Sequence, residues 1–352
     1  MTKKVLILLP LLPLFLSGCL INIKTEQAAD GGVYKSSDQG DTWSAVSSVY
    51  RVGEATRTFA SSDVTVMVVD PTDRQAIYVG TSAGDLFYTY NGGEAWSQSL
   101  AKVGNINAIA VDPVDRCIIY AAIDNRVYKS TDCSRHWDYQ LIETRDNPNN
   151  QITSLAIDPY NPRIIYAGTS GSGLFVSEDS AYSWHVNRNF SGRVAKILIN
   201  PKNANIIYLA TAGQGVFKSV DHGQTWRNIF EGKVEKNKSE VLSYRELILD
   251  PTVDDGLFYA SSYGLMRSAN GGETWQELKL LTPPKTTVIY SLAINPKNGS
   301  EIFYGTSEAF YRSHDNGLNW ITRKLPSSRS AKHLMIDPQN PKILFLGVKK
   351  VN

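Results

Sequence analysis

GVFKSVDHGQTW, residues 215–226, is the stretch of sequence that decides the fold. It follows the pattern Ser-x-Asp-x-Gly-x-Thr-Trp, and a related stretch ends at each of the seven tryptophans of the chain. Successive tryptophans are 41 to 53 residues apart, and self-similarity at such a period indicates a repeat architecture. The aspartate position and closing tryptophan of the copies are Asp38 and Trp43, Asn91 and Trp96, Asp132 and Trp137, Asp179 and Trp184, Asp221 and Trp226, Asn270 and Trp275, and Asp315 and Trp320.

A second signature alternates with the first. It consists of an apolar residue, Asp or Asn, Pro, a few polar residues and then an apolar and aromatic run such as IIYAG, residues 164–168. Strict alternation of the two signatures makes a chance origin untenable. The seven copies start at Asp70, Asp112, Asp158, Asn200, Asp250, Asn295 and Asp337.

Each repeat contains four short strand signals, which in one copy are QITSLAID (151–158), RIIYAGT (163–169), GLFVSED (173–179) and SWHVNR (183–188). Alternating apolar residues, β-branched and aromatic content and Gly, Pro and Asn punctuation all favour strands over helices. Four strands in a repeat of 40 to 50 residues are typical of a propeller blade. The first strand is nearly all apolar, so we expect it to be the innermost strand.

The two ends of the chain complement each other. GVYKSSDQGDTW (32–43) lacks the two strands that precede the motif elsewhere, and AKHLMIDPQNPKILFLGVKK (331–350) lacks the motif that should follow it. The sequence therefore predicts an all-β fold: a seven-bladed β-propeller of four-stranded blades over residues 31–352, with its last blade closed by both termini. Such closure removes exposed sheet edges.

The N-terminus reads as a signal sequence. Lys3 and Lys4 precede a short apolar stretch that contains prolines, and LSGC (16–19) resembles the lipobox of bacterial lipoproteins. We expect residues 1–18 to be removed, Cys19 to be lipidated and residues 19–30 to form a short tether. The protein would then be extracytoplasmic and lipid-anchored to a bacterial membrane, with the cell surface, the periplasmic face and the outer membrane all left open.

Charge and cysteine content narrow the function classes. Without residues 1–18 the chain has 34 basic and 34 acidic residues, so it lacks the basic footprint of a nucleic-acid-binding protein. We expect no nucleic-acid partner and no cofactor.

The pair Asp124-Asn125 would fold its flanking strands into a hairpin and place Cys117 almost opposite Cys133. Both a disulfide and two free thiols stay open.

The repeated motif resembles the Asp-box, or BNR repeat, of sialidases, sortilin, xyloglucan-cleaving glycosidases and photosystem II assembly factors. The resemblance implies a propeller whose Asp accepts backbone hydrogen bonds in the turn, whose Gly adopts a positive φ and whose Trp packs between strands. Ser134 and Ala181 replace the Gly, so we expect those two turns to differ. Each copy has one carboxylate, whereas an EF-hand-type calcium loop has several. A calcium site is therefore the less favoured interpretation, and we expect no metal.

The opposite face of the ring is the expected binding face, because functional positions need not repeat. Cationic and aromatic residues break the pattern near the start of the innermost strands in three blades, and Tyr263 and Tyr290 lie at comparable heights. Together they would form an arc on one side of the channel mouth. A site for an acidic peptide or a carboxylated ligand and a solvated rim with internal ion pairs are the two readings of this set. The residues are Arg193, Lys196, Tyr244, Arg245, Tyr263, Tyr290, Lys332 and His333.

Three function classes fit a propeller. The first, which we favour, is a non-catalytic membrane-anchored scaffold for protein interaction or assembly, in the company of the photosystem II assembly factors and sortilin. The second is a sialidase-like or xyloglucanase-like glycosidase, which needs a carboxylate pair. Glu246 has only Asp63 and Glu54 as candidate partners, and the chain lacks the sialidase Arg-Ile-Pro motif. The third is glycan binding through exposed aromatics such as Tyr50, Tyr263 and Tyr290.

Overall fold

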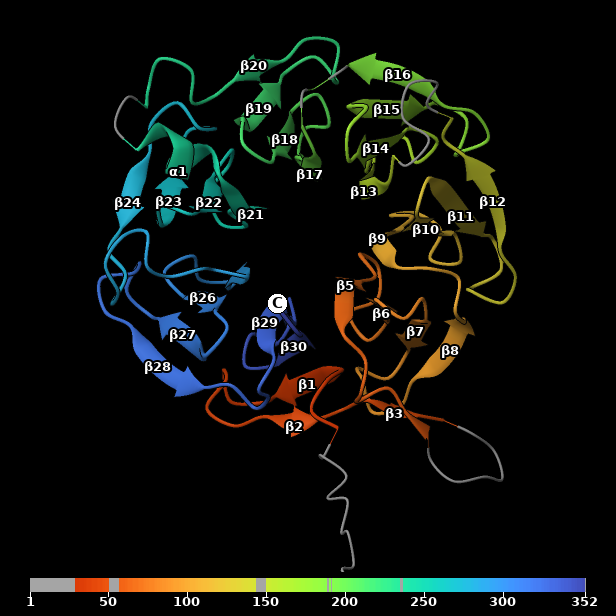
Figure 1. Ribbon diagram of the computed structural model, residues 1–352, viewed down its shortest axis with the longest axis horizontal. Coiled ribbons are helices and arrows are strands. Elements are labelled where there is room, and N and C mark those ends of the chain that lie inside the picture. The colour runs from red at the N-terminus through yellow and green to blue at the C-terminus, as the bar shows by residue number, and fades with distance from the viewer. Residues whose placement is uncertain are drawn as a thin grey trace, which may run out of the picture.

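The chain folds into a ring of seven four-stranded antiparallel sheets around a central axis (Figure 1). This computed structural model describes residues 29–50, 57–143, 150–188, 190, 192–234 and 237–351. The predicted signal sequence and the lipidation site Cys19 lie outside the described residues. The predicted all-β, seven-bladed propeller is confirmed.

We number the blades 1 to 7 around the ring, each from the innermost strand outward. Blades 1 to 3 are β5 (Val64–Val69), β6 (Ile77–Thr81), β7 (Leu86–Thr89) and β8 (Ser97–Leu100); β9 (Ile106–Val111), β10 (Ile119–Ile123), β11 (Arg126–Ser130) and β12 (Asp138–Leu141); and β13 (Ile152–Ile157), β14 (Ile165–Thr169), β15 (Leu174–Ser177) and β16 (His185–Arg188). Blades 4 and 5 are β17 (Val194–Ile199), β18 (Ile207–Thr211), β19 (Gly215–Ser219) and β20 (Arg227–Asn228); and β21 (Tyr244–Leu249), β22 (Leu257–Ser261), β23 (Leu265–Ser268) and β24 (Gln276–Leu278). Blade 6 is β25 (Ser291–Ile294), β26 (Ile302–Gly305), β27 (Ala309–Ser313) and β28 (Ile321–Lys324), and blade 7 is β29 (Ser330–Ile336), β30 (Leu344–Lys349), β1 (Val33–Ser36) and β2 (Ser44–Ala45).

Blade 7 closes the ring with strands from both ends of the chain. Strand β1 pairs antiparallel with β30, from Val33 opposite Gly347 to Ser36 opposite Leu344. The two segments lie side by side at the bottom of Figure 1, where the first and last colours of the chain meet. This is the pairing that the complementary ends of the sequence predict, and it joins parts of the chain some 300 residues apart.

The core consists of aromatic and aliphatic side chains between neighbouring blades. The second strand of every blade places a buried aromatic ring there, at the aromatic position of the IIYAG-type run. Large rings at this position fill the wedge that opens between blades toward the rim of the ring. These residues are Tyr78, Tyr120, Tyr166, Tyr208, Tyr259, Tyr304 and Phe345.

The repeated motif forms the turn between the third and fourth strands. In the GVFKSVDHGQTW copy, Oδ1 of Asp221 accepts hydrogen bonds from the backbone N–H of Thr225 (2.8 Å) and from the Ser219 hydroxyl (2.7 Å). The backbone N–H of Gly223 donates to the same serine Oγ at 2.8 Å. Asn270 keeps the arrangement, because its Oδ1 accepts from the Thr274 N–H at 2.9 Å. Hydrogen bonds between residues of the motif itself therefore stabilise the turn.

The two turns without glycine keep the backbone of the glycine turn, and the expected difference is one of detail: the N–H of Arg135 donates to Oδ1 of Asp132 at 3.0 Å, whereas that of Gln224 donates to the carbonyl of Asp221 at 3.4 Å. Ser134 and Ala181 adopt φ values of 68° and 71°, in the left-handed region where Gly223 has 83°. Their N–H groups donate to the serine at the start of the turn at 2.9 and 2.8 Å, as the glycine does. The hydrogen bonds outweigh the cost of a left-handed L-residue, which is about 1–2 kcal/mol.

Acid should weaken these turns. Hydrogen bonds from the side chain and backbone of Thr225, and then from Ser219, lower the pKa of Asp221 to about 2. Because the pKa is depressed in the folded state, this stabilisation is complete above the unfolded pKa of about 4 and is lost as pH falls toward 2. We expect Asp221→Asn to lose less stability than the parent between pH 5 and pH 2.5 in urea titrations. The exposed Asp254→Asn is the matched control, and an equal response of both variants would contradict the prediction.

Two short elements interrupt the repeat pattern. Strands β3 (Ser48–Val49) and β4 (Arg57–Thr58) form a hairpin at the outer edge of blade 1. The sequence predicts no helix, but helix α1 (Lys238–Leu242) precedes β21 and buries Val241. Within the described part of the chain, no helix has the length and apolar character needed to cross a membrane.

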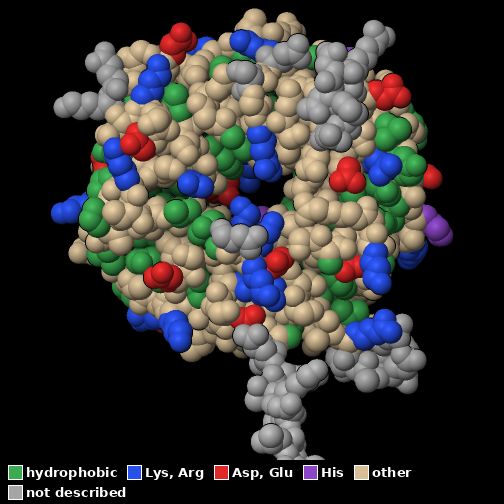
Figure 2. All heavy atoms as spheres, in the orientation of Figure 1, with side chains coloured by type: hydrophobic (Ala, Val, Ile, Leu, Met, Phe, Trp, Pro, Cys, Tyr) green, Lys and Arg blue, Asp and Glu red, His purple; other side chains and the backbone are tan. Residues whose placement is uncertain are grey.

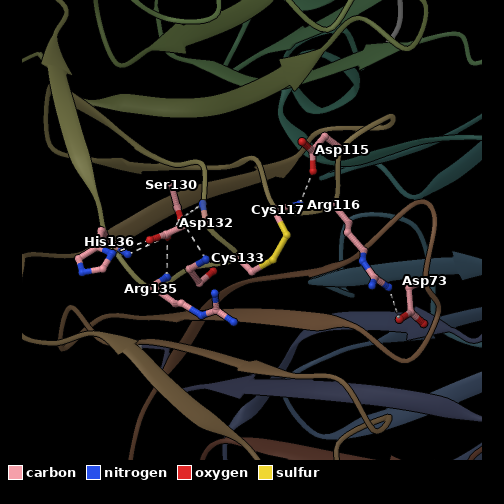
Figure 3. Close-up of a disulfide and its surroundings, with 10 residues drawn as sticks. Asp73, Asp115, Arg116, Cys117, Ser130, Asp132, Cys133, Arg135 and His136 are labelled. Carbon is pink, nitrogen blue, oxygen red and sulfur yellow. Dashed lines mark hydrogen bonds and ion pairs between the residues drawn. A yellow bond between two sulfur atoms is a disulfide. The ribbon is translucent and has the colours of Figure 1, made fainter.

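Cys117 and Cys133 form a disulfide, which settles the alternatives left open above (Figure 3). It links the residues just before β10 and just after β11, where the N–H of Cys133 also donates to the carbonyl of Cys117 at 3.1 Å. Because the bridge spans 16 residues, it should contribute about 3 kcal/mol by restricting the unfolded chain. We expect a reductant to lower the urea midpoint of the parent and to leave a Cys117→Ser/Cys133→Ser variant unchanged. Equal urea midpoints of the parent with and without reductant would contradict this.

Candidate functional site

A cavity of about 630 Å³ opens at one mouth of the central channel, and all seven blades contribute to its wall. It lies where the innermost strands begin, so residues early in β5, β9, β13, β17, β21 and β29 face it. The space-filling view is hollowed at this point and shows Lys and Arg side chains around the opening (Figure 2). Its volume falls within the range of about 300–1,000 Å³ that is usual for ligand sites.

Five cationic side chains line the cavity. Four of them lie in β17, β21, β29 and β30, and Arg193 directly precedes β17; these strands form an arc along one side of the channel (Figure 1). Four of them were predicted from the sequence, and the fifth, Lys349, was missed. Lys349 lies opposite Ser330 in the β29–β30 ladder, and this register becomes readable only after the closing blade is aligned. The five are Arg193, Lys196, Arg245, Lys332 and Lys349.

Glu246 is the only carboxylate among the described residues that line the cavity. Its Oε1 accepts hydrogen bonds from the Tyr244 hydroxyl at 3.2 Å and from the N–H of Leu247 at 3.1 Å. The same oxygen lies 3.3 Å from Nζ of Lys196. Glu246 is thus held by its own strand and by Lys196 of the neighbouring blade. Its negative charge therefore pairs with one of the five cations and leaves four without it.

The other cations lack an acidic partner within the described residues. Burial lowers the pKa of Lys332, and the charges of Lys349, Lys196 and Arg193 lower it further against the opposing effect of Glu246. Arg245 donates to the Ser262 hydroxyl at 3.1 Å. Like charges that converge from several strands repel one another, and a bound anion would relieve this repulsion, which makes the cluster a candidate binding site.

His333 has a structural role. Its Nε2–H donates to the carbonyl of Thr65 at 2.7 Å, across the boundary between blades 7 and 1. Burial, followed by the nearby Lys332 charge, lowers the pKa of His333 to about 3, so the ring is neutral near pH 7. His333 therefore lines the cavity without adding to its positive charge.

Of the two tyrosines predicted outside β21, only one reaches the cavity. Tyr290 lies just before β25 and lines it. Tyr263 lies in the turn between the second and third strands of blade 5, farther from the axis, and its hydroxyl donates to Glu277 at 3.1 Å. It lines a separate hollow of about 310 Å³ beside Leu281 and Pro283. Placing Tyr263 on the channel arc was therefore wrong.

The arrangement does not supply the carboxylate pair that glycoside hydrolysis requires. Asp63 accepts hydrogen bonds from Arg329 at 2.7 Å and from the N–H of Lys350 at 2.8 Å, so it is committed to a structural ion pair. Glu54 lies outside the described residues. Among the residues that the structure places, Glu246 faces cations and has no second acid across the cavity.

Sequence comparison finds partial likeness to xyloglucanases. No protein-family model matches the chain. A xyloglucanase from Paenibacillus sp. is 25% identical over 146 residues, which are 35% of this chain and 14% of that protein. Xyloglucanase Xgh74A from Acetivibrio thermocellus is 27% identical over 146 residues, 35% of this chain and 17% of that protein. The match therefore spans a small part of these relatives.

Solved structures share the propeller fold. The xyloglucanase from Xanthomonas campestris has a TM-score of 0.67 at 17% identity, over 82% of this chain and 51% of that chain. YCF48 bound to a D1 peptide has a TM-score of 0.60 at 15% identity, over 83% and 93%. The extracellular part of BT4673 from B. thetaiotaomicron has a TM-score of 0.62 at 17% identity, over 86% and 39%. Structural likeness at identities this low shows the shared fold alone. The function has to be inferred from the site.

Proposed function

We propose that this protein is a non-catalytic binding propeller, anchored to a membrane outside the cytoplasm, that holds a protein partner at the cationic mouth of its channel. The observation that carries the proposal is the convergence of five cations and one ion-paired carboxylate on a cavity of about 630 Å³. Complementary charge at an interface speeds association and selects the partner.

The extent of the solved neighbours supports the proposal through the fold alone. YCF48 is a propeller of similar extent, since the alignment covers 93% of it, and its structure contains a bound peptide. The xyloglucanase of Xanthomonas campestris is aligned over only 51% of its chain. In the extent of the shared propeller, this chain therefore has a fuller counterpart in a protein solved with a bound peptide than in a glycosidase.

The cellular location rests on separate features. The positive N-terminus, apolar stretch and LSGC at residues 16–19 support export and lipidation of Cys19. The Cys117–Cys133 disulfide agrees with an oxidising compartment, because such bonds are rare in the cytosol. Both features are compatible with a tethered protein that works beyond the cytoplasmic membrane.

Neutralising the cations of the channel mouth should strongly reduce partner capture. We expect a variant with Arg193, Lys196, Arg245 and Lys332 all changed to Gln to recover at least about ten-fold less crosslinked partner than the parent, because charged contacts at an interface are worth a few kcal/mol together. The matched control changes Arg116, Arg163, Lys202 and Lys297 to Gln, four exposed cations near the turns at the far ends of the innermost strands. Equal recovery from both variants would remove the proposed site.

Glycosidase activity is the second candidate, favoured by the partial likeness to xyloglucanases. It predicts turnover of fluorogenic xyloglucan fragments or sialosides, with loss of activity in Glu246→Gln. We expect no turnover by the full chain, because the described cavity residues offer no second carboxylate. Turnover that depends on Glu246 would replace the binding proposal.

A further inference from the structure

The two sides of the cavity have different chemistry. Blades 4, 5 and 7 supply the cations, whereas blades 1, 2 and 3 supply neutral side chains on the other side of the channel (Figure 1). On the neutral side, Met67, Ile109 and Leu155 belong to the wall; Met67 is partly exposed, whereas Ile109 and Leu155 are buried with only their edges accessible. A ligand that fills the cavity must therefore contact both a cationic and an aliphatic surface.

Hydroxyl groups on the neutral side are already engaged in the fold. Oγ1 of Thr65 donates to the carbonyl of Ile106 at 2.5 Å, and Oγ1 of Thr153 donates to the carbonyls of Gly168 at 3.1 Å and Val194. These bonds join blade 1 to blade 2 and blade 3 to blade 4. Asn105 and Asn107 also line this side, and the Asn105 amide N–H donates to Oδ1 of Asn107. The carbon surface left for an apolar group is therefore that of Met67 and the exposed edges of Ile109 and Leu155.

Glu246 opposes the binding of a negatively charged ligand. Its carboxylate lies 3.3 Å from Nζ of Lys196 and is held by the Tyr244 hydroxyl and by the backbone N–H of Leu247. It would repel an incoming carboxylate, so the ligand must gain more from Arg193, Lys332 and Lys349 than it loses to Glu246. The glutamate thus weakens anion binding without blocking it.

We propose that the cavity binds an internal acidic–aliphatic segment of the partner, with one or two acidic side chains directed to Arg193, Lys332 and Lys349 and the adjacent aliphatic side chain against Met67, Ile109 and Leu155. The inference rests on the proposed function and specifies what the partner presents. The acidic side chain supplies charge-assisted hydrogen bonds, and the aliphatic side chain supplies burial against the neutral wall.

Capped peptides test the two halves separately. The probe is a fluorescent acetyl-Ser-Glu-Glu-Leu-Val-Ser-amide peptide, which has no terminal carboxylate, titrated with the full chain at low salt. We expect a peptide with Gln for both Glu residues to bind about ten-fold more weakly or worse, because charge-assisted hydrogen bonds are lost. A peptide with Ser for Leu and Val should also bind about ten-fold more weakly, because an apolar side chain is no longer buried.

Three protein variants complete the test. Lys332→Gln should weaken the acidic peptide and leave the Gln peptide unchanged, Glu246→Gln should tighten the acidic peptide, and Lys297→Gln should change neither. Equal binding of all peptides, or displacement of the acidic peptide by an equal concentration of inorganic phosphate, would overturn the acidic–aliphatic segment. Charge-dependent capture of the partner together with no peptide binding would overturn this inference alone, whereas loss of both would overturn the proposed function.

Discussion

Replacing Arg329 with Ala should destabilise the propeller by about 3 kcal/mol, although Arg329 belongs to no repeated motif. The guanidinium is only 7% exposed and lies 2.7 Å from Oδ1 of Asp63 and 3.3 Å from Oδ1 of Asp30. Its Nη2 also donates to the carbonyl of Ser61 at 3.0 Å. These contacts tie together the segments that lead into β1, β5 and β29, so their loss leaves two carboxylates without their cation at the closure of the ring.

Urea unfolding of Arg329→Ala beside Arg323→Ala checks this prediction. Arg323 also pairs with a carboxylate, Asp41, at 2.9 Å, but both groups are about 40% exposed. Removal of such a surface pair should cost no more than about 1 kcal/mol. Hydrogen exchange in β1 and β30 should accelerate in Arg329→Ala alone. Similar midpoints for the two variants would show that the pairing of β1 with β30 closes the ring without this arginine.

The propeller architecture was predictable from the sequence because the same turn motif and strand pattern recur in every repeat. Each motif copy reports the same turn, and the incomplete ends of the chain fix how the ring closes before any coordinate is known. The candidate site was predictable for the opposite reason, since Arg193, Lys196 and Arg245 stand where other blades carry small or neutral residues. Departure from a repeat is informative only when the repeat has been aligned correctly.

The missed features depend on contacts between parts of the chain that the repeat does not relate. Arg329 finds its carboxylates 266 and 299 residues away, and such pairings leave no local pattern. Lys349 reaches the cavity only through the register of β30. Tyr263 was misplaced because a position along the blade says nothing about distance from the axis. Ser134 and Ala181 keep the glycine turn because the hydrogen bonds of the motif define its backbone.

Trp96 should be the most costly of the seven motif tryptophans to truncate. It is the one that is completely buried, and its Nε1–H donates to the carbonyl of Val46 at 2.5 Å. The hairpin of β3 and β4 covers it, because Phe59 meets the indole edge-on at 5.5 Å and stacks on Phe87 at 4.3 Å. We expect Trp96→Ala to cost about 3–5 kcal/mol, the range for a large aromatic side chain removed from a core.

Trp184→Ala is the matched comparison, because this ring closes the same motif in blade 3 but is only half-buried. It should cost about 2 kcal/mol or less, since less apolar surface leaves water on folding. A cycle of Trp96→Ala, Phe59→Ala and the double variant would measure a coupling of about 0.5–1.5 kcal/mol for the ring pair. If both tryptophan variants unfold at the same urea concentration, the hairpin does not reinforce blade 1, and the stability of the ring lies in the repeated core alone.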